Sequence, residues 1–253
     1  MTYSLSELMT AVLARGLMDG EVAIMGAVSA IPMTACRLAQ LRHAPNLWYI
    51  AGGSGAVNPH LRPVVASSCD QRLLDADTVL PLSDVVLLEG RGDVIGTFFA
   101  GGLQIDQYGN CNLIAVGDWH RPALRGPGTV GLPFLLKAGR VVLYTQAHNP
   151  RTFVPRVDFR SGQGFLGGPE EWRQQGQGGG PAQVVTNLGV FDFHPETRRM
   201  RLRSVHPGVT VEQVLANTGF RPELAEAIGE TEPPWEEELA LIRQIDAQGL
   251  LRS

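Results

Sequence analysis

The stretch "WYIAGGSGAVNP", Trp48 to Pro59, has the composition of a ligand-binding loop but contains no acid, no base and no strong nucleophile. An apolar run leads into its short polar residues: Gly52, Gly53, Ser54, Gly55 and, three residues on, Asn58. Glycines permit positive φ angles and close approach, so backbone N–H groups here could hold an anion, but a plain tight turn has the same composition. The loop has neither the phosphate-binding nor the dinucleotide-binding motif, and Ser54 lacks the Gly-x-Ser-x-Gly spacing of a hydrolase nucleophile.

A second glycine pair, Gly101 and Gly102, follows an aromatic pair and precedes Gln104. The residues after it, "IDQYGNCNL", predict a β-hairpin in which Asp106 and Asn110 serve the turn. Gln104 and the glycine pair are candidates for contacting a substrate from this hairpin.

A third glycine-rich stretch, "RPALRGPGTVGLP", presents Arg125 beside Gly126 and Gly128. This arrangement suits pairing with a carboxylate or phosphate, although an exposed loop arginine has the same pattern. Asp106 is the only acid within the three glycine stretches, so this site lacks its own general base. The six histidines show no spacing typical of metal ligands, and we expect no metal.

Alternating helical and apolar segments are expected to position these loops. Residues 3–16 predict an amphipathic helix with Gly16 as its stop, a short strand ends at Gly26, and a second helix is expected from Pro32 to about His43. "NLWYIA" is the next strand. This order predicts βα units around an open, mostly parallel sheet flanked by helices, with ligands bound beyond the carboxyl ends of the strands.

Further strands are predicted at four apolar runs: 84–89, 113–116, 141–145 and 184–193. Residues 162–181 have little hydrophobic pattern and are expected to form a long excursion. "PPWEEELALIRQI" predicts an amphipathic helix that begins after Pro233 and Pro234. We therefore expect one α/β domain over residues 1–225 and a tail over residues 226–253.

Composition excludes several classes of function. The 253 residues carry 21 basic and 25 acidic side chains, a net charge of -4, which does not favour binding to nucleic acid or to a membrane surface. No apolar run reaches the roughly 18 residues of a membrane span, and no secretion signal is evident, so a cytoplasmic location is expected. Cys36, Cys69 and Cys111 suggest neither a disulfide framework nor a zinc site, and we expect buried thiols.

Seven stretches, in order, resemble the β subunits of the family I coenzyme A transferases, the group that includes glutaconate CoA-transferase. The resemblance runs over most of the chain and is carried by "PNLWYIAGGSG", "GGLQIDQYGNCN", "LRGPGTVGLP", "RTFVPRVDFRSGQG", "VVTNLGVFDF", "HPGVT" and "NTGF". In that family, the loop after the "PNL" strand usually carries a glutamate that attacks the acyl-CoA thioester. Here Gly52 or Gly53 stands at that place, so the resemblance implies a subunit that has lost the covalent nucleophile.

This departure is similar to one branch of the family, the steroid-degradation hydrolases that open the last steroid ring of a cyclic keto-acyl-CoA. The stretches "WYIAGGSGAVNPHLRP" and "GDWHRPALRGPG" look like the β subunit of that branch. The resemblance implies a heteromer with an α subunit, α₂β₂ in the family, whose acidic residue supplies the base. It implies no cofactor beyond the coenzyme A carried by the substrate.

Roles for individual residues follow from this resemblance. Asn58 would donate to a carbonyl oxygen, Arg125 would pair with a carboxylate or steady the partner's acid, and Ser54 would donate a further hydrogen bond. The remaining residues would form the wall of the substrate site and supply backbone donors for an oxyanion: Gly52, Gly53, Gly55, Gly101, Gly102, Gln104, Gly126 and Gly128.

Two alternatives remain open at the level of sequence. The chain could belong to a true CoA transferase whose nucleophile lies elsewhere, with Glu89 and Asp70 as the acids to consider. It could also be a non-catalytic structural subunit, for which the absence of a base is expected.

Overall fold

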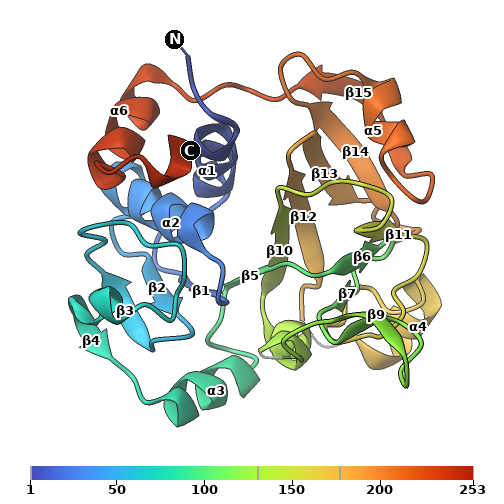
Figure 1. Ribbon diagram of the computed structural model, residues 1–253, viewed down its shortest axis with the longest axis horizontal. Helices are drawn as coiled ribbons and strands as arrows, with labels where there is room; N and C mark the ends of the chain where they lie inside the picture. The colour runs from blue at the N-terminus through green and yellow to red at the C-terminus, as the bar shows by residue number, and fades with distance from the viewer. Residues whose placement is uncertain (1, 130, 177, 253) are drawn as a thin grey trace. The chain divides into compact units, whose positions relative to one another are not determined.

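The computed structural model describes residues 2–129, 131–176 and 178–252, and the chain forms two compact units (Figure 1). The first unit contains residues 1–99 and 232–253, and the second contains residues 100–231. The tail expected from residue 226 is thus divided, because its first residues belong to the second unit and the rest to the first. The assignment of residues 1–225 to a single domain stays a prediction.

The first unit begins with the two helices and two strands that the sequence pattern predicts. Ser4 caps the first helix by accepting from the N–H of Glu7 at 3.1 Å, while the Glu7 carboxylate accepts from the N–H of Ser4 at 2.7 Å. Gly16 follows the last turn, as expected. The elements are α1 (Leu5–Arg15), β1 (Val22–Met25), α2 (Ala30–Arg42) and β2 (Trp48–Ala51).

The sheet of this unit has the strand order β5-β1-β2-β3-β4. β5 (Thr97–Ala100), β1 and β2 are parallel, which confirms the predicted α/β class. β3 (Ala56–Pro59) and β4 (Ala76–Val79) extend the sheet by antiparallel pairing. β2 and β3 are joined by residues 52–55, so the glycine loop is the turn of a hairpin as well as the end of a parallel strand.

One of the predicted strands is wrong. Residues 84–89 lie within a helix, α3 (Leu82–Gly90), which begins directly after Pro81. Proline is favoured at helix starts, and the run "DVVLLE" places Val85 and Glu89, four residues apart, on one buried face. The apolar run alone did not distinguish a helix from a buried strand. A short 3₁₀ helix, η1 (Gln71–Leu74), precedes β4.

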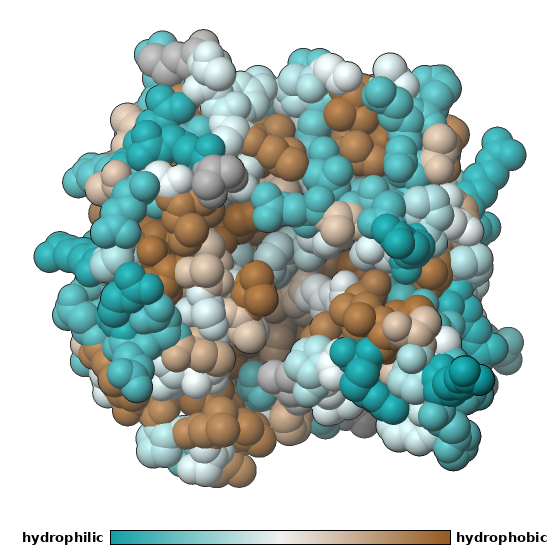
Figure 2. Space-filling model, in the orientation of Figure 1, coloured by the Kyte–Doolittle hydropathy of each residue, from teal (hydrophilic) through white to brown (hydrophobic). Residues whose placement is uncertain are grey.

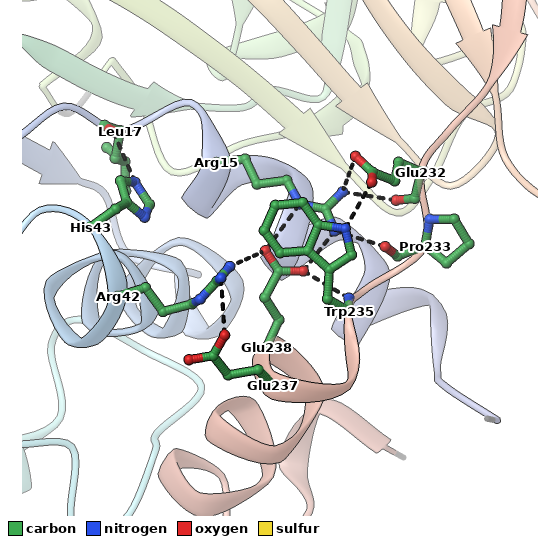
Figure 3. Close-up of polar contacts among 9 residues, drawn as sticks. All are labelled: Arg15, Leu17, Arg42, His43, Glu232, Pro233, Trp235, Glu237 and Glu238. Atoms are coloured by element: carbon green, nitrogen blue, oxygen red, sulfur yellow. Dashed lines mark hydrogen bonds and ion pairs between the residues drawn. The ribbon is translucent and has the colours of Figure 1, made fainter.

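The C-terminal segment returns to the first unit as α6 (Glu236–Ile245), followed by η3 (Leu250–Arg252). Glu238, only 1% exposed at its side chain, accepts from Arg15 at 2.6 Å and from Arg42 at 2.9 Å (Figure 3). The guanidinium groups of both arginines also lie over the ring of Trp235, at 4.5 and 4.7 Å from its centre. These contacts fasten α6 to α1 and α2.

The main strands of the second unit follow the order β10-β12-β13-β14-β15. β10 pairs with β12 and β14 with β15 in parallel, while β13 is antiparallel to both of its neighbours. The strand predicted at 141–145 is confirmed, whereas the run 184–193 is two strands joined by a turn. The bounds are β10 (Arg140–Thr145), β12 (Pro181–Thr186), β13 (Gly189–Phe193), β14 (Met200–Val205) and β15 (Glu223–Glu230).

Smaller elements complete the second unit. The predicted hairpin is confirmed as β6 (Gln104–Asp106) and β7 (Cys111–Asn112), and β11 (Phe153–Val154) pairs with β6. The run 113–116 is a loop leading into β8 (Ala115–Gly117), which pairs with β9 (Pro122–Arg125). The excursion at 162–181 includes a short helix. The helices are η2 (Leu132–Lys137), α4 (Pro169–Gln175) and α5 (Val211–Ala216). Among the described residues, no helix has the length and apolar character needed to cross a membrane.

Candidate active site

Three loops of the first unit meet beyond the carboxyl ends of β1 and β2. The N–H of Ser68 donates to the carbonyl of Ala27 after β1 at 2.8 Å, and the N–H of Gly53 after β2 donates to the Ser68 hydroxyl at 3.2 Å. The N–H of Gly52 donates to the carbonyl of Met25 at 3.0 Å. Residues 67–69 therefore join the two strand-end loops, at the edge where α/β sheets bind ligands.

Two glycines of this loop are required by the backbone. Gly55 has a φ of +73°, and a β-carbon there would overlap the carbonyl oxygen of Leu80, whose own N–H donates to Gly55 at 2.9 Å. A β-carbon on Gly52 would lie 2.9 Å from the carbonyl oxygen of Met25. The chain's own backbone, rather than a ligand, accounts for these two positions.

Gly53 is different, because side chains fill the space beside it. A β-carbon at this position would overlap the sulfur of Cys69 and would lie 2.9 Å from the hydroxyl oxygen of Ser68. Ser68 is fully buried and Cys69 is exposed. A glutamate at Gly53 would therefore require the side chains of Ser68 and Cys69 to shift.

The loop's backbone donors are engaged within the protein. The N–H groups of Ser54 and Gly55 both donate to the carbonyl of Ala51, at 3.1 and 2.9 Å, and those of Gly52 and Gly53 are bonded as described above. The Ser54 hydroxyl donates to the same carbonyl at 3.3 Å and accepts from the N–H of Ala56 at 3.3 Å. In this geometry, the loop is a wall and does not present the oxyanion donors that were expected.

Asn58 is not brought to the glycine loop. It lies in β3 opposite the start of β2, where its side-chain oxygen accepts from the N–H of Tyr49 at 3.0 Å and from Gln40 at 3.1 Å. Its amide group donates to Asp77 at 3.0 Å. Asn58 has a φ of +48°, which asparagine tolerates better than most residues. These contacts give Asn58 a structural role, and its predicted contact with substrate finds no support here.

Two further acids of this unit have shifted pKa values. Burial raises the pKa of Glu89 to about 7. Hydrogen bonds from Arg72 hold the pKa of Asp70 down to about 2, and this carboxylate also caps η1. Asp70 is thus committed to local structure, while Glu89 is a buried acid on α3.

In the second unit, Gln104 lies in a buried polar network. Its side-chain oxygen accepts from Asn112 at 2.7 Å and from the N–H of Asp158 at 3.0 Å, and its amide group donates to the Asp158 carboxylate at 3.1 Å. Asp106 accepts from the N–H groups of Tyr108 and Asn110, which is the predicted turn chemistry. Burial raises the pKa of Asp106, with these hydrogen bonds opposing the shift.

The glycine pair before this hairpin, Gly101 and Gly102, follows directly after β5. A β-carbon on Gly102 would lie 2.8 Å from the carbonyl oxygen of Gln104, and one on Gly101 would lie 3.0 Å from that of Tyr144. Gly101 and Gly102 thus remain candidates for backbone donors to a substrate.

Arg125 lies on β9, exposed to solvent. It donates to the carbonyl of Trp119 at 3.2 Å, and its guanidinium lies 4.9 Å from the centre of the Trp119 ring. The N–H groups of Gly126 and Gly128 donate to the carbonyls of Ile114 and Leu113, at 2.8 and 3.2 Å. A β-carbon on Gly126 would overlap the carbonyl of Leu113, so this glycine is also required by the chain's own packing.

The structure divides the expected site residues between the two units. Gly52, Gly53, Ser54, Gly55 and Asn58 lie in the first unit, and Gly101, Gly102, Gln104, Arg125, Gly126 and Gly128 lie in the second. Sequence reasoning missed Ser68 and Cys69, which lie beside Gly53. The expectation of buried thiols is confirmed for Cys36 and Cys111 and is wrong for Cys69. Among the described residues, no cluster of histidine, cysteine and carboxylate side chains could hold a metal ion.

Comparison with known proteins identifies the family to which this chain is similar. The coenzyme A transferase family matches residues 6–217. One subunit of the 3-oxoadipate CoA-transferase of Pseudomonas knackmussii is 35% identical over 250 residues, which cover 97% of this chain and 94% of the relative. The cholesterol ring-cleaving hydrolase IpdB subunit of Rhodococcus jostii is 31% identical over 233 residues, covering 89% of this chain and 85% of the relative.

A solved structure gives the same result for the fold. The crystal structure of glutaconate coenzyme A-transferase from Acidaminococcus fermentans matches with a TM-score of 0.87 at 28% identity, covering 100% of this chain and 98% of that one. The family match spans most of the chain, and the likeness to the curated relatives and the solved structure extends over nearly all of it. The chain belongs to the coenzyme A transferase family.

Proposed function

We propose that the chain is the β subunit of a heteromeric enzyme, α₂β₂ in composition, that opens the last ring of a cyclic keto-acyl-CoA by hydrolysis of a carbon–carbon bond. The proposal needs no cofactor beyond the coenzyme A carried by the substrate. The names of the relatives support a partner, because both the transferase chain from Pseudomonas knackmussii and the hydrolase chain from Rhodococcus jostii are named as subunits.

The observation that carries the proposal is the space at Gly53. Transfer of coenzyme A through a covalent enzyme intermediate requires a carboxylate nucleophile. At Gly53, the sulfur of Cys69 and the hydroxyl of Ser68 fill the space in which such a side chain would begin. In hydrolysis, a base takes a proton from the water that attacks the ring ketone, and donors stabilise the oxyanion that forms. The carbon–carbon bond then breaks to give a carboxylate, and the departing carbon takes up the proton that the base had removed. This route does not need a carboxylate nucleophile at Gly53.

The base and the oxyanion donors of the reaction come from the partner and from the second unit. The partner's acid supplies the base, since Asp70 and Asp106 are committed to hydrogen bonds within this chain. The N–H groups of Gly101 and Gly102 supply the donors for the developing oxyanion, because those of residues 52–55 are already engaged. Arg125, exposed on β9, pairs with a carboxylate of the product or with the partner's acid.

An exposed apolar surface also supports a partner. On α3, the side chains of Leu82 and Leu87 are 66% and 69% exposed, and Val79 of β4 is 43% exposed. Figure 2 shows hydrophobic surface gathered over the position of α3. Contiguous apolar surface of this kind is typical of protein contacts.

A second candidate is a true CoA transferase, which is favoured by the 35% identity to the 3-oxoadipate enzyme over 97% of this chain. Its nucleophile would then be an acid outside the glycine loop. Glu89, a buried acid of the first unit with a pKa of about 7, is the residue to examine.

The test is a single-turnover reaction of the co-expressed complex with a cyclic keto-acyl-CoA in water enriched in heavy oxygen. Ring hydrolysis places heavy oxygen in a new carboxylate while coenzyme A stays attached. Transfer of coenzyme A to an added dicarboxylic acid, without ring opening, would overturn the proposal in favour of the transferase. Absence of both reactions with a panel of acyl-CoA substrates would favour a non-catalytic subunit. The chain purified without its partner is the control and is expected to be inactive.

A further inference from the structure

A pocket of about 400 Å³ lies in the first unit, away from the glycine loop. Its walls come from three segments far apart in sequence: one face of α2, the residues that follow β3, and the end of α6. The lining residues include Arg37, Leu41, His60, Arg62 and Ile245. A volume of this size suits a small molecule.

Two arginines, Arg37 and Arg62, line the pocket. Arg62 is exposed and has no hydrogen-bond or ion-pair partner among the described residues. Arg37 donates to Gln40 at 3.0 Å through one of its terminal nitrogens, which leaves its other N–H groups available. Arginines with free donors favour carboxylate or phosphate groups, because their planar geometry matches two oxygens at once.

The carboxylates near the pocket already have partners within the chain. Asp75 and Asp77 contact the two ring nitrogens of His60, at 2.9 and 3.3 Å, and Asp77 also accepts from Asn58 at 3.0 Å. Asp246, at the end of α6, accepts from the N–H groups that follow it in η3. None of these carboxylates forms an ion pair with Arg37 or Arg62 among the described contacts, although the charge of Arg37 contributes to the lowered pKa of Asp77. Both guanidinium groups keep N–H donors for an external anion.

The rest of the lining is apolar or uncharged. Leu41, Leu61, Pro63 and Ile245 supply hydrocarbon surface, and Gln244 and Gln248 supply neutral amides. Asn58 does not line the pocket, but it donates to Asp77, which in turn contacts the lining residue His60. An oxyanion carried on a short apolar body matches this lining better than a bare inorganic ion.

We propose that this pocket binds a small organic anion, with a carboxylate or phosphate held by Arg37 and Arg62 and its apolar part against Leu41 and Ile245. Because the pocket includes the end of α6, bound ligand stabilises the docking of the C-terminal segment. This inference does not depend on the reaction proposed above, because no residue of the glycine loops lines the pocket.

The test is calorimetric titration of the co-expressed complex with hexanoate, hexyl phosphate, hexanamide and inorganic phosphate. We expect hexanoate and hexyl phosphate to bind, and the one that binds more tightly identifies the preferred head group. Hexanamide and inorganic phosphate should each bind at least about tenfold more weakly, since hexanamide lacks the negative charge and inorganic phosphate lacks the apolar chain. Slower amide exchange over residues 244–248 in the presence of the tighter ligand is the second readout.

Variants distinguish this site from unspecific binding. Arg62→Gln and Arg37→Gln should each weaken the anion by roughly tenfold, the loss typical of one charge-assisted contact. Arg91→Gln is the matched control, because Arg91 is an exposed arginine of the same unit that pairs only with Asp93 among the described residues. Equal binding of hexanamide, unchanged affinity in both pocket variants, or no binding of either hexyl anion at about 10 mM would each overturn the proposal.

Discussion

The sulfur of Cys69 lies where a β-carbon on Gly53 would have to stand. This contact joins residues 52–55 to residues 67–69. It therefore bears on why the glycine loop carries no carboxylate nucleophile. The space beside Gly53 is not open, because the side chains of Ser68 and Cys69 occupy it. The absence of a side chain at Gly53 and the positions of Ser68 and Cys69 are therefore one structural feature.

This contact predicts a measurable coupling between the two positions. Gly53→Ala should lower the free energy of unfolding by about 1–3 kcal/mol, the usual range for overpacking. Cys69→Ala alone should cost little, because Cys69 is exposed. In the double variant, part of the loss should be regained, since only Ser68 and the backbone of Cys69 would still be close. Urea unfolding of the four proteins measures the coupling, and strict additivity of the two changes would contradict it.

The same geometry predicts selective alkylation. In the native protein, iodoacetamide should modify Cys69 and leave Cys36 and Cys111 unreacted, because both are buried and burial raises the pKa of each thiol. Mass spectrometry of tryptic peptides before and after denaturation measures the pattern. Cys69→Ala is the control and should remove the native reaction. Modification of Cys36 or Cys111 at a similar rate would show that this core opens readily.

Elements governed by local signals were predicted well from sequence. The helix that ends at Gly16, the hairpin turn of Asp106 and Asn110, and the helix after Pro234 all depend on residues within a few positions of one another. α3 was mistaken for a strand because a short run of valine and leucine is compatible with both a helix and a buried strand. Only tertiary packing determines which of the two forms.

The candidate site was less predictable, because its contacts are long-range. Asn58 follows a glycine loop in sequence, but antiparallel pairing of β3 carries it to the other end of β2, beside Tyr49. Ser68 and Cys69 carry no local signal that places them against Gly53. The glycines of residues 52–55 indicated that other atoms approach the backbone closely there. They did not indicate whether those atoms belong to a ligand or to the protein itself.

Glu89 offers a direct test between the two candidate reactions. Its raised pKa means that the folded protein holds this proton up to about pH 7, whereas the unfolded chain releases it above about pH 4.5. Ionisation therefore costs stability as the pH rises through this window, and Glu89→Gln should raise the melting temperature at pH 8 but not at pH 4. Asp84→Asn, an exposed change on the same helix, should give no such gain.

The activity of Glu89→Gln completes this test. Retained ring hydrolysis in the variant complex is expected under the proposed function. Loss of all turnover, with a folded heteromer and an unchanged affinity for acyl-CoA, would instead point to Glu89 as the missing nucleophile of a transferase.

His148 predicts a loss of stability in mild acid. It is buried between Thr186 and Thr218 and stacks on Phe153, and burial lowers its pKa from 6.5 to about 4. The folded state keeps the ring neutral while the unfolded chain takes up a proton below pH 6.5, so the stabilising contribution is full above pH 6.5 and is lost toward pH 4. At pH 5 the loss is about 2 kcal/mol.

Urea unfolding from pH 7.5 to pH 5 measures this effect. His148→Gln should lower the stability at neutral pH and flatten its dependence on pH. His120→Gln, at an exposed histidine of the same unit, should leave the slope unchanged. An unchanged slope in His148→Gln would show that other groups cause the acid sensitivity.

The last prediction concerns the attachment of the C-terminal helix. Glu238 accepts from Arg15, from Arg42 and from the N–H of Trp235, and its side chain is 1% exposed (Figure 3). Glu238→Ala leaves two partly buried guanidinium groups without this acceptor and should destabilise the protein by about 3 kcal/mol, as breaking a buried ion pair usually does. Glu237→Ala is the matched control, because Glu237 is 71% exposed, binds the same Arg42 and should cost less than about 1 kcal/mol. Amide exchange should locate the loss in residues 236–252. If both variants cost the same, the buried carboxylate does not fasten α6, and the contacts of the Trp235 ring with Arg15 and Arg42 must carry that role instead.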